Sequence, residues 1–366
     1  MKRLLLTTTL LFSILSFSQK EELKALKKIY DKETHSTKDL ETYKTTLANL
    51  ESIVSEESDK VYANFYKGML PLLELGALGP KATPADQMKI FDPSSLMNFS
   101  KAVTETIAYE EKSGKKVYTK DIEETLSWFK PMLSQAAFQL NDASRFKEAS
   151  SVFYIIYNLD KKDGSNLENA ALLALQSEDY QLAEKLYEEY KTSDYLNKGV
   201  VYFATDKASG QEQQMPNKET RTKMISLGTH ERPREEKMIT KKPEVYKMHA
   251  LITAQVGDFE KAKKSFAEAR ELLSKDEELL NGENQLYFNY GYKLLEDDQS
   301  IVDELNKNLN NKAKYDELMA KRKNIFKNAL PYFEKAFEIK PSDENTRVIL
   351  KMTYEILEMK DKAAKI

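Results

Sequence analysis

Apolar residues recur along much of the chain at steps of three and four, the spacing that places side chains on one face of an α-helix. In residues 258–269, DFEKAKKSFAEA, this spacing joins Ala262, Phe266 and Ala269. The same spacing of an alanine, an aromatic residue four positions on and an apolar or aromatic residue three positions further occurs three more times, in residues 145–156, 179–190 and 325–336. The pattern predicts amphipathic helices in these segments.

A fixed interval separates some of these copies. Ala149 and Ala183 are 34 residues apart, and Ala329 and Ala363 are again 34 residues apart. Each of the four full copies also has an aromatic residue three positions before its small residue; these are Phe146, Tyr180, Phe259 and Phe326. A 34-residue period containing two short helices is that of the tetratricopeptide repeat.

The chain therefore resembles the tetratricopeptide-repeat family, most clearly over residues 130–192, 243–275 and 283–366. In the last copy, the first helix of the consensus is matched by Tyr287, Tyr290, Gly291 and Leu294. Its second helix is matched, after an insertion, by Ala329, Phe333 and Pro341. In the earlier copies the corresponding first-helix pairs are Leu133 with Ala137, Leu167 with Ala171, and Tyr246 with Ala250.

Small residues at these positions have a packing role. A glycine or alanine where two helices cross lets their backbones approach closely, and an aromatic residue four positions along fills the space toward the next hairpin. One hairpin cannot bury its apolar face alone, so the copies are expected to stack. The residues expected in this packing are Ala149, Phe153, Ala183, Tyr187, Gly257, Ala262, Phe266, Gly291, Ala329, Phe333, Ala336 and Pro341.

The resemblance implies an all-α solenoid of stacked antiparallel helix hairpins, to which the sequence adds a small β-hairpin insertion. In this family the inner face, formed by the first helices of successive hairpins, typically holds an extended peptide. On the matching positions of this chain the groove candidates are Phe138, Asn141, Lys247, Leu251, Phe288 and Tyr292.

These patterns divide the chain into six parts. They are a secretory signal (1–18), an N-terminal helical region (19–129), repeats one and two (130–194), an insertion (195–242), repeat three (243–282), and repeat four with a helical insertion and C-terminal capping helices (283–366). Within the second part, Tyr62, Phe65, Tyr66 and Gly68 are candidates for a degenerate repeat. Its FDPSS sequence, residues 91–95, predicts a helix start with a serine cap, and Pro131 predicts the start of the first clear repeat helix.

Two insertions interrupt the repeats. Residues 199–215 hold two extended runs around a DKASG turn and predict a β-hairpin, and residues 219–237 predict a short helix followed by a charged loop. The surface candidates in this first insertion are Tyr202, Arg221, His230, Arg232 and Arg234. Its excess of basic residues either steers an acidic partner or is ordinary loop composition. Residues 298–322 are expected to lengthen both helices of the fourth hairpin into a charged arm.

The first residues have the order of a secretory signal. Lys2 and Arg3 precede an apolar stretch of 14 residues, 4–17, which is short against the roughly 20 residues that span a bilayer. Small residues near its end place the expected cleavage between Ser18 and Gln19. We therefore expect an exported protein, resembling exported bacterial members of the family and periplasmic in a cell with two membranes, with no membrane span in the mature chain.

Composition narrows the function. The chain has a net charge of −3, which does not favour a nucleic-acid partner, and it has no cysteine for disulfides, thiolate metal sites or thiol nucleophiles. Its three histidines, His35, His230 and His249, have neither metal-site spacing nor an evident catalytic partner. The sequence thus predicts no catalytic, cofactor-binding or metal-binding residue.

The function expected from these observations is a non-enzymatic, exported scaffold that binds a protein or peptide partner in the cell envelope. An alternative is a helical-repeat protein that binds a small molecule or glycan, with clustered aromatic and polar groups under residues 199–237. An enzyme is the third alternative, and it would require converging buried acids near His230.

Overall fold

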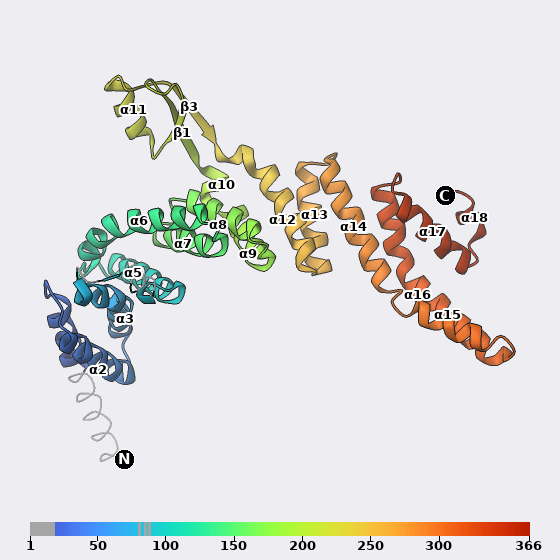
Figure 1. Cartoon of the computed structure of the whole chain (residues 1–366), viewed down its shortest axis with the longest axis horizontal. Helices are drawn as coiled ribbons and strands as arrows, with labels where there is room; N and C mark the ends of the chain where they lie inside the picture. The colour runs from blue at the N-terminus through green and yellow to red at the C-terminus, as the bar shows by residue number, and fades with distance from the viewer. Residues whose placement is uncertain (1–18, 80–81, 84–85, 87–88) are drawn as a thin grey trace, which may run out of the picture. The chain divides into compact units, whose positions relative to one another are not determined.

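The computed structural model describes residues 19–79, 82–83, 86 and 89–366, so the predicted signal and its cleavage site at Ser18 lie at or beyond the edge of the described chain. The chain forms two compact units, Met1–Ser177 and Glu178–Ile366 (Figure 1). Both units are mostly helical, as the sequence predicts, and the second also holds a small antiparallel sheet. In the described part of the chain, we find no helix with the length and apolar character needed to cross a membrane.

The first unit is built from helices alone in its described residues. They are a helix over residues 19–30, α2 (Thr37–Ile53), α3 (Glu57–Leu78), α5 (Pro93–Ser113), α6 (Thr119–Asp142), α7 (Phe146–Leu159) and α8 (Ser165–Gln176). Helix α3 packs on α5, and α7 packs on both α6 and α8. The close approach of α7 and α8 is fixed by the buried Ser150 hydroxyl, which donates to the carbonyl oxygen of Ala170 at 2.7 Å.

A buried carboxylate joins α5 to α6. Glu110 accepts hydrogen bonds from the backbone N–H groups of Val117, Tyr118 and Thr119, each at 2.9 Å, and from the Thr119 hydroxyl at 2.6 Å. These N–H groups belong to the first turn of α6 and its approach, where a helix has no internal acceptors. Glu110 therefore caps the next helix in sequence, across a turn that Gly114 makes with a φ of 70°.

Two local predictions in this unit are wrong. Helix α6 begins at Thr119, so Pro131 lies inside the helix rather than at its start. Helix α5 is capped by the Asp92 carboxylate, which accepts from the N–H groups of Ser94 and Ser95, and not by a serine. Asp92 precedes Pro93, whose missing N–H makes it a favourable first helical residue, so the acid is the residue placed to cap.

The second unit contains most of the repeat-like segments. Its helices are α9 (Tyr180–Thr192), α10 (Asp194–Lys198), α11 (Lys218–Ser226), α12 (Lys242–Val256), α13 (Phe259–Leu272), α14 (Glu277–Lys293), α15 (Asp298–Lys307), α16 (Lys312–Ile339), α17 (Glu344–Ile356) and α18 (Lys360–Ala363), with a 3₁₀ turn at Met238–Lys241. Helix α12 packs on α9, α13 and α14, and α16 packs on α14 and α17.

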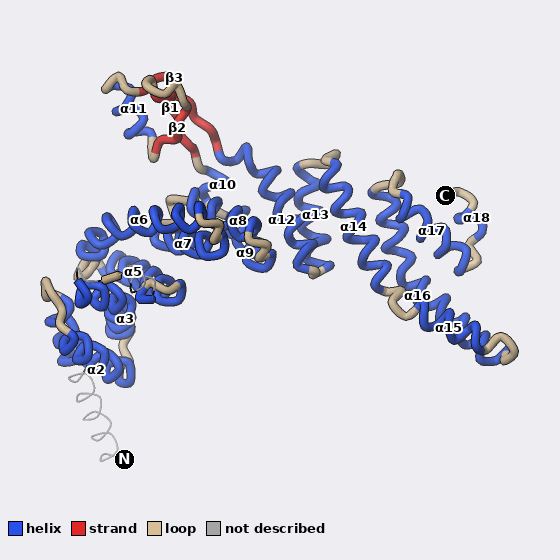
Figure 2. Tube along the Cα trace, viewed as in Figure 1, coloured by secondary structure: helices blue, strands red, loops and turns tan. Residues whose placement is uncertain are grey.

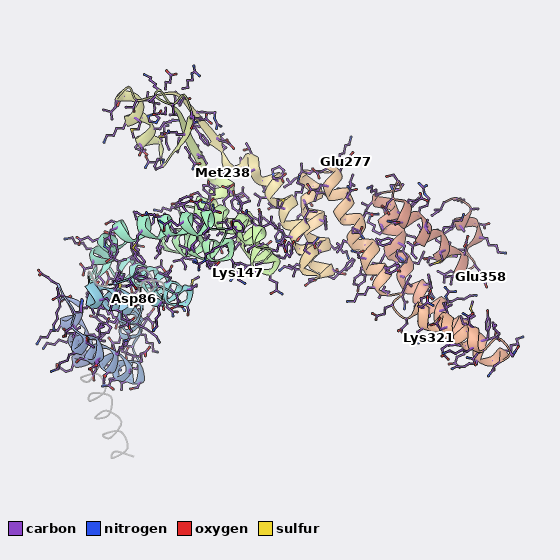
Figure 3. All side chains as sticks on the ribbon, in the orientation of Figure 1. Asp86, Lys147, Met238, Glu277, Lys321 and Glu358 are labelled. Carbon is purple, nitrogen blue, oxygen red and sulfur yellow. The ribbon has the colours of Figure 1, made fainter. Side chains whose placement is uncertain are left out.

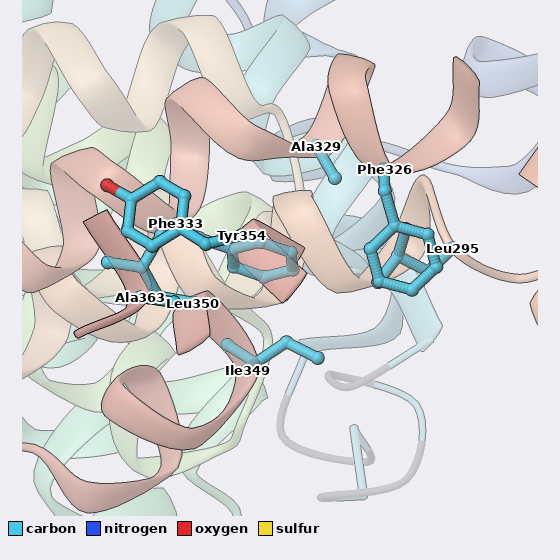
Figure 4. Close-up of a cluster of buried hydrophobic side chains, with 8 residues drawn as sticks. All are labelled: Leu295, Phe326, Ala329, Phe333, Ile349, Leu350, Tyr354 and Ala363. Carbon is cyan, nitrogen blue, oxygen red and sulfur yellow. The ribbon is translucent and has the colours of Figure 1, made fainter. Parts of the chain in front are cut away.

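The small residues of this unit lie where helices meet. Ala183, Ala262 and Ala329 are fully buried, and a Cβ added to Gly291 would lie 2.8 Å from the ring of Phe333. The Phe333 ring belongs to a cluster of buried side chains from α16, α17, α18 and the turn after α14 (Figure 4). Its members are Leu295, Phe326, Ala329, Phe333, Ile349, Leu350, Tyr354 and Ala363. Gly257 ends α12 with a φ of 93°, a left-handed conformation that favours glycine.

The first insertion is a three-stranded antiparallel sheet with the order β2-β1-β3 (Figure 2). The predicted hairpin is present as β1 (Val200–Asp206) and β2 (Glu212–Met215), and the predicted short helix is α11. The predicted charged loop is wrong, because His230–Lys237 forms β3 and pairs with β1. At the base of the insertion the N–H of Met238 donates to the carbonyl of Gly199 at 2.9 Å (Met238 is labelled in Figure 3).

The second insertion forms the expected arm, with one difference. Helix α15 packs against the first half of α16, and the pair extends away from the other helices of its unit (Figures 1 and 3, with Lys321 labelled on α16). Ile301, Leu305 and Leu318 form its small core, and the Arg322 guanidinium donates to both Asp298 oxygens, at 2.7 and 3.0 Å. Only α16 is lengthened: α14 ends at Lys293, and α15 is a separate helix.

Candidate binding groove

In the first unit, two exposed apolar side chains occupy equivalent places on α6 and α8. Phe138 is 55% exposed and follows the fully buried Ala137, and Leu172 is 50% exposed and follows the fully buried Ala171. The two exposed residues are 34 positions apart. Leu172 was not among the predicted groove residues, although the same interval that relates Ala137 to Ala171 would have found it.

In the second unit, Leu251 on α12 and Tyr292 on α14 hold the same place, directly after Ala250 and Gly291. Tyr292 is 59% exposed, and its ring stacks on that of Phe288 with centroids 6.0 Å apart. Leu251 is half-buried because it lines a groove between α12 and α14. Helices α6, α8, α12 and α14, which correspond to the first helices of the predicted repeats, thus each carry a large apolar or aromatic residue. In each helix this residue directly follows a small residue, Ala137, Ala171, Ala250 or Gly291.

The groove between α12 and α14 has a volume of about 320 Å³. Helix α12 contributes Leu251, Ala254 and Gln255, and α14 contributes residues on its facing side. These α14 residues are Gly282, Gln285, Leu286, Asn289, Tyr290 and Lys293. The rings of Phe259 and Tyr290, which also line the groove, stack at 4.0 Å between centroids.

The groove is lined mainly by apolar side chains and by side-chain amide groups. Gln285 donates to the side-chain oxygen of Asn289 at 2.6 Å, which orients both amides along the same side of α14. Amide side chains can both donate to and accept from a peptide main chain. Lys293 is the one charged lining residue, and within the described chain no carboxylate lies within 4.0 Å of its ammonium. The groove suits an extended, mainly apolar segment better than a strongly charged ligand.

Of the six predicted groove residues, Leu251 lines this groove; Phe138 and Tyr292 are exposed outside it, and the remaining three have other surroundings. The Lys247 ammonium lies 3.1 Å from Glu244, 3.2 Å from Glu278 and 3.6 Å from Asp276, and its hydrogen bond to Glu244, against the opposing effect of burial, raises its pKa. Phe288 packs against the buried clusters around Phe333 and Tyr287 rather than into the groove.

Asn141 is half-buried near the end of α6, where its carbonyl accepts from the N–H of Ser144. It does not line the α12–α14 groove, which belongs to the other unit.

Two arginine candidates of the insertion are held by acidic and aromatic side chains of the insertion itself. Arg221 lies over the Tyr202 ring at 5.0 Å and donates to Glu235 at 2.8 Å. Arg234 lies over the Phe203 ring at 4.1 Å between Glu212 and Glu236.

The other two insertion candidates differ in exposure. His230 is buried, with its ring nitrogens 2.9 Å from the Thr229 hydroxyl and 3.2 Å from the Gln213 side-chain oxygen. Arg232 is exposed and has a φ of 53°, next to the irregularity in the β1–β3 register. The insertion is thus held together by the residues expected on its surface, with Arg232 the one most open to solvent.

A buried ionic network, which the sequence did not predict, joins α9, α12 and α13. The Lys191 ammonium, 5% exposed, donates to Glu268 at 2.7 Å, to Glu188 at 3.0 Å and to Nδ1 of His249 at 3.3 Å. Burial opposes the charge of Lys191, but the hydrogen bonds to Glu268 and Glu188 outweigh it and raise its pKa.

The same network holds His249 neutral at ordinary pH. Burial and then the Lys191 charge lower its pKa, against the opposing effect of Glu188 and Glu184, whose oxygens lie 3.1 and 3.5 Å from Nε2. Because Lys191 donates to Nδ1, the ring proton belongs on Nε2, which faces the two carboxylates. The network fastens α12 to its neighbours on both sides.

Comparisons with known proteins do not assign the chain to a family. No model of a protein family matches the chain, and no curated protein matches it significantly.

Proposed function

We propose that the chain is an exported scaffold of stacked, tetratricopeptide-like hairpins, which binds an extended peptide segment of a protein partner in the cell envelope. The observation that carries the proposal is the recurrence of one large apolar or aromatic position, exposed at Phe138, Leu172 and Tyr292 and half-buried at Leu251, on helices α6, α8, α12 and α14. Stacked helical repeats create extended concave surfaces, and repeat proteins use these surfaces for binding.

The groove between α12 and α14 is the proposed centre of binding. Leu251 and Leu286 supply apolar contacts, and the Gln285 and Asn289 amides can pair with a main chain. A volume of about 320 Å³ accommodates a few side chains of an extended segment rather than a folded domain. The alternative of a small-molecule site under the insertion has less support, because His230, Arg221 and Arg234 are engaged in the insertion's own contacts.

A display selection tests this proposal. Peptides selected from a random library on the whole mature protein should bind the wild type, and Leu251→Asp should weaken them at least about tenfold, the effect of losing roughly 1.4 kcal/mol. Lys264→Glu, on an exposed part of α13, is the control and should leave their affinity unchanged. Peptides that bind Leu251→Asp as tightly as the wild type would contradict the proposed groove.

A further inference from the structure

The first unit contains a second cavity, distinct from the groove, at the junction of three segments. It has a volume of about 650 Å³ and lies between residues 30–35, helix α3 and the first half of α6. This volume is within the range of small-ligand sites. We call it the Trp128 pocket, because it is lined by Trp128, which is the only tryptophan of the chain and is 50% exposed.

Apolar and aromatic residues form part of the lining of the pocket. Met69, Leu72 and Leu73 of α3 line it, and Tyr30 joins Trp128 as its second aromatic residue. The Trp128 ring meets Phe129 edge-on, at 5.5 Å between centroids and an angle of 74°. A half-exposed tryptophan beside a cavity can stack on a planar or cationic group, and tryptophan is the strongest of the aromatic residues in binding cations through its ring face.

Charge decides which kind of ligand suits this pocket. Its lining carries the carboxylates of Asp31, Glu33, Asp121 and Glu124 against the single ammonium of Lys32. With their ion-pair partners Lys27, Lys120 and Asp39 included, the formal charge of the site is −2 (five negative, three positive). Lys32 forms an ion pair with Asp39, which lies outside the pocket. The local field therefore favours a cation.

Two of the four carboxylates have no ion-pair partner among the described residues. Asp31 pairs with Lys27 at 3.0 Å, and Glu124 pairs with Lys120 at 3.6 Å on a well-exposed helix face. In the part of the chain that the structure describes, no basic group lies within 4.0 Å of the carboxylates of Glu33 or Asp121. These two acids come from different segments, the loop after residue 30 and the first turn of α6.

We propose that the Trp128 pocket binds an arginine side chain of a peptide. A guanidinium is planar, donates five N–H groups and stacks on aromatic rings, so its chemistry matches both the Trp128 ring and the carboxylates of Glu33 and Asp121 in this lining. An ammonium lacks the planar face, and a neutral sugar would leave the charge of the pocket uncompensated. This proposal is independent of the α12–α14 groove.

The single tryptophan makes the test direct. The emission of Trp128 in the whole mature protein is followed during titration with N-acetyl-arginine amide and, separately, with N-acetyl-citrulline amide, which has the same shape without the charge. The arginine compound should give a saturable change that weakens as salt is added, and the citrulline compound should bind at least about tenfold more weakly.

Variants separate this site from unspecific binding. Asp121→Asn and Glu33→Gln should each weaken the arginine compound about threefold to tenfold, whereas Glu111→Gln, an exposed acid on α5, should have no effect. Circular dichroism of each variant checks its folding, and calorimetric titration of Trp128→Phe, which should bind more weakly, supplies a readout without the tryptophan. Equal binding of the citrulline compound, no saturable change, or unchanged affinity in both acid variants would overturn the proposal.

Discussion

At the scale of single residues, small side chains decide how closely helices approach. Gly291 and Phe333 show the reason most clearly, because any side chain on the glycine would meet a ring that is fully buried and has no room to move. The buried alanines at 183, 262 and 329 hold comparable places on α9, α13 and α16. Their burial explains why the sequence keeps small residues at a fixed distance from an aromatic residue.

Enlarging Gly291 should therefore destabilise the second unit. We expect Gly291→Val to lower its free energy of unfolding by about 2 kcal/mol, since extra atoms in a filled core force neighbouring side chains to move. Gly76→Ala is the matched control: this glycine lies in α3, is exposed, and has only one atom near its added Cβ, at 3.6 Å. It should stabilise the first unit by about 0.5–1 kcal/mol. Denaturant unfolding of both variants measures the two effects, and destabilisation by both would contradict this explanation.

The buried histidine should make stability depend on pH. The pKa of His249 in the folded chain is lowered, first by burial and then by Lys191, so the unfolded chain binds more protons near the ordinary histidine pKa of 6.5. Stability from neutral His249 is therefore complete above pH 6.5 and is lost as the pH falls from 6.5 toward the lower folded pKa. The charged groups that face the ring are Glu184, Glu188 and Lys191 on α9, with Glu268 and Lys261 bound to the same groups from α13.

Denaturant unfolding at pH 7.5 and pH 5.5 measures this effect. The wild type should be less stable at pH 5.5, and His249→Gln should show a smaller difference between the two values. Glu188 has a lowered pKa, because its hydrogen bond to Lys191 outweighs burial, so its contribution is lost only at more acidic pH, below about 4.5. An identical pH dependence in wild type and His249→Gln would show that the histidine is not its source.

At the scale of elements, the start of helix α6 is capped by a side chain from the preceding helix, α5. This side chain is Glu110, whose one carboxylate at the end of α5 accepts the N–H groups that begin α6. Replacing it by alanine would leave three N–H groups near or inside the core without an acceptor. The junction between α5 and α6 therefore depends on one residue.

We expect Glu110→Ala to lower the unfolding free energy of the first unit by about 3 kcal/mol, the cost of leaving buried donors unsatisfied. The adjacent Glu111 is exposed, and Glu111→Ala should change stability by less than about 0.5 kcal/mol. Chemical denaturation followed by circular dichroism compares the two. A similar loss in both variants would mean that Glu110 does not cap α6.

The helices and strands that could be predicted from the sequence are those with one apolar face buried in the core. The helices with a regular pattern of small and aromatic residues were predicted well, because their apolar faces are buried. Strand β3, HERPREEK, was missed because its side chains bind one another and the solvent, so it shows no apolar alternation. The extent of α6 was missed because Pro131 was interpreted as a helix start.

The candidate groove was predicted only in part for a similar reason. Leu251 follows from the repeat, since it lies beside a small residue, Ala250, whereas Tyr292, predicted by the same rule, is exposed and does not line the groove. Gln285 and Asn289 do not follow from it, because helical spacing does not tell which polar residues face a neighbouring helix and which face solvent. Lys191 and His249 are 58 positions apart, on either side of the insertion, so no local sequence pattern predicts their contact.

At the scale of the whole molecule, the insertion forms a separate small structure within its unit. Its sheet and α11 are held by Arg221, Tyr202 and Glu235, and its two ends meet through the backbone hydrogen bond between Gly199 and Met238. The ends are thus close enough to be joined by a short linker. Its removal leaves the contacts of α12, α13 and α14 in place.

Replacing residues 200–237 by a short glycine-serine linker should leave the second unit folded, with a melting temperature within a few degrees of the wild type. Peptides that bind the α12–α14 groove should keep their affinity for the shortened protein. Thermal unfolding and titration with the selected peptides measure both outcomes. Loss of peptide binding in a protein that remains folded would show that the insertion takes part in recognition.

The most direct test of the central claim is hydrogen–deuterium exchange of residues 19–366 with and without a selected peptide. If the groove between α12 and α14 is the binding surface, the peptide should slow exchange in residues 250–256 of α12 and 282–293 of α14, and leave residues 263–272 of α13, which do not line the groove, unchanged. Protection confined to the insertion or to α13, with none in α12 and α14, would contradict the account.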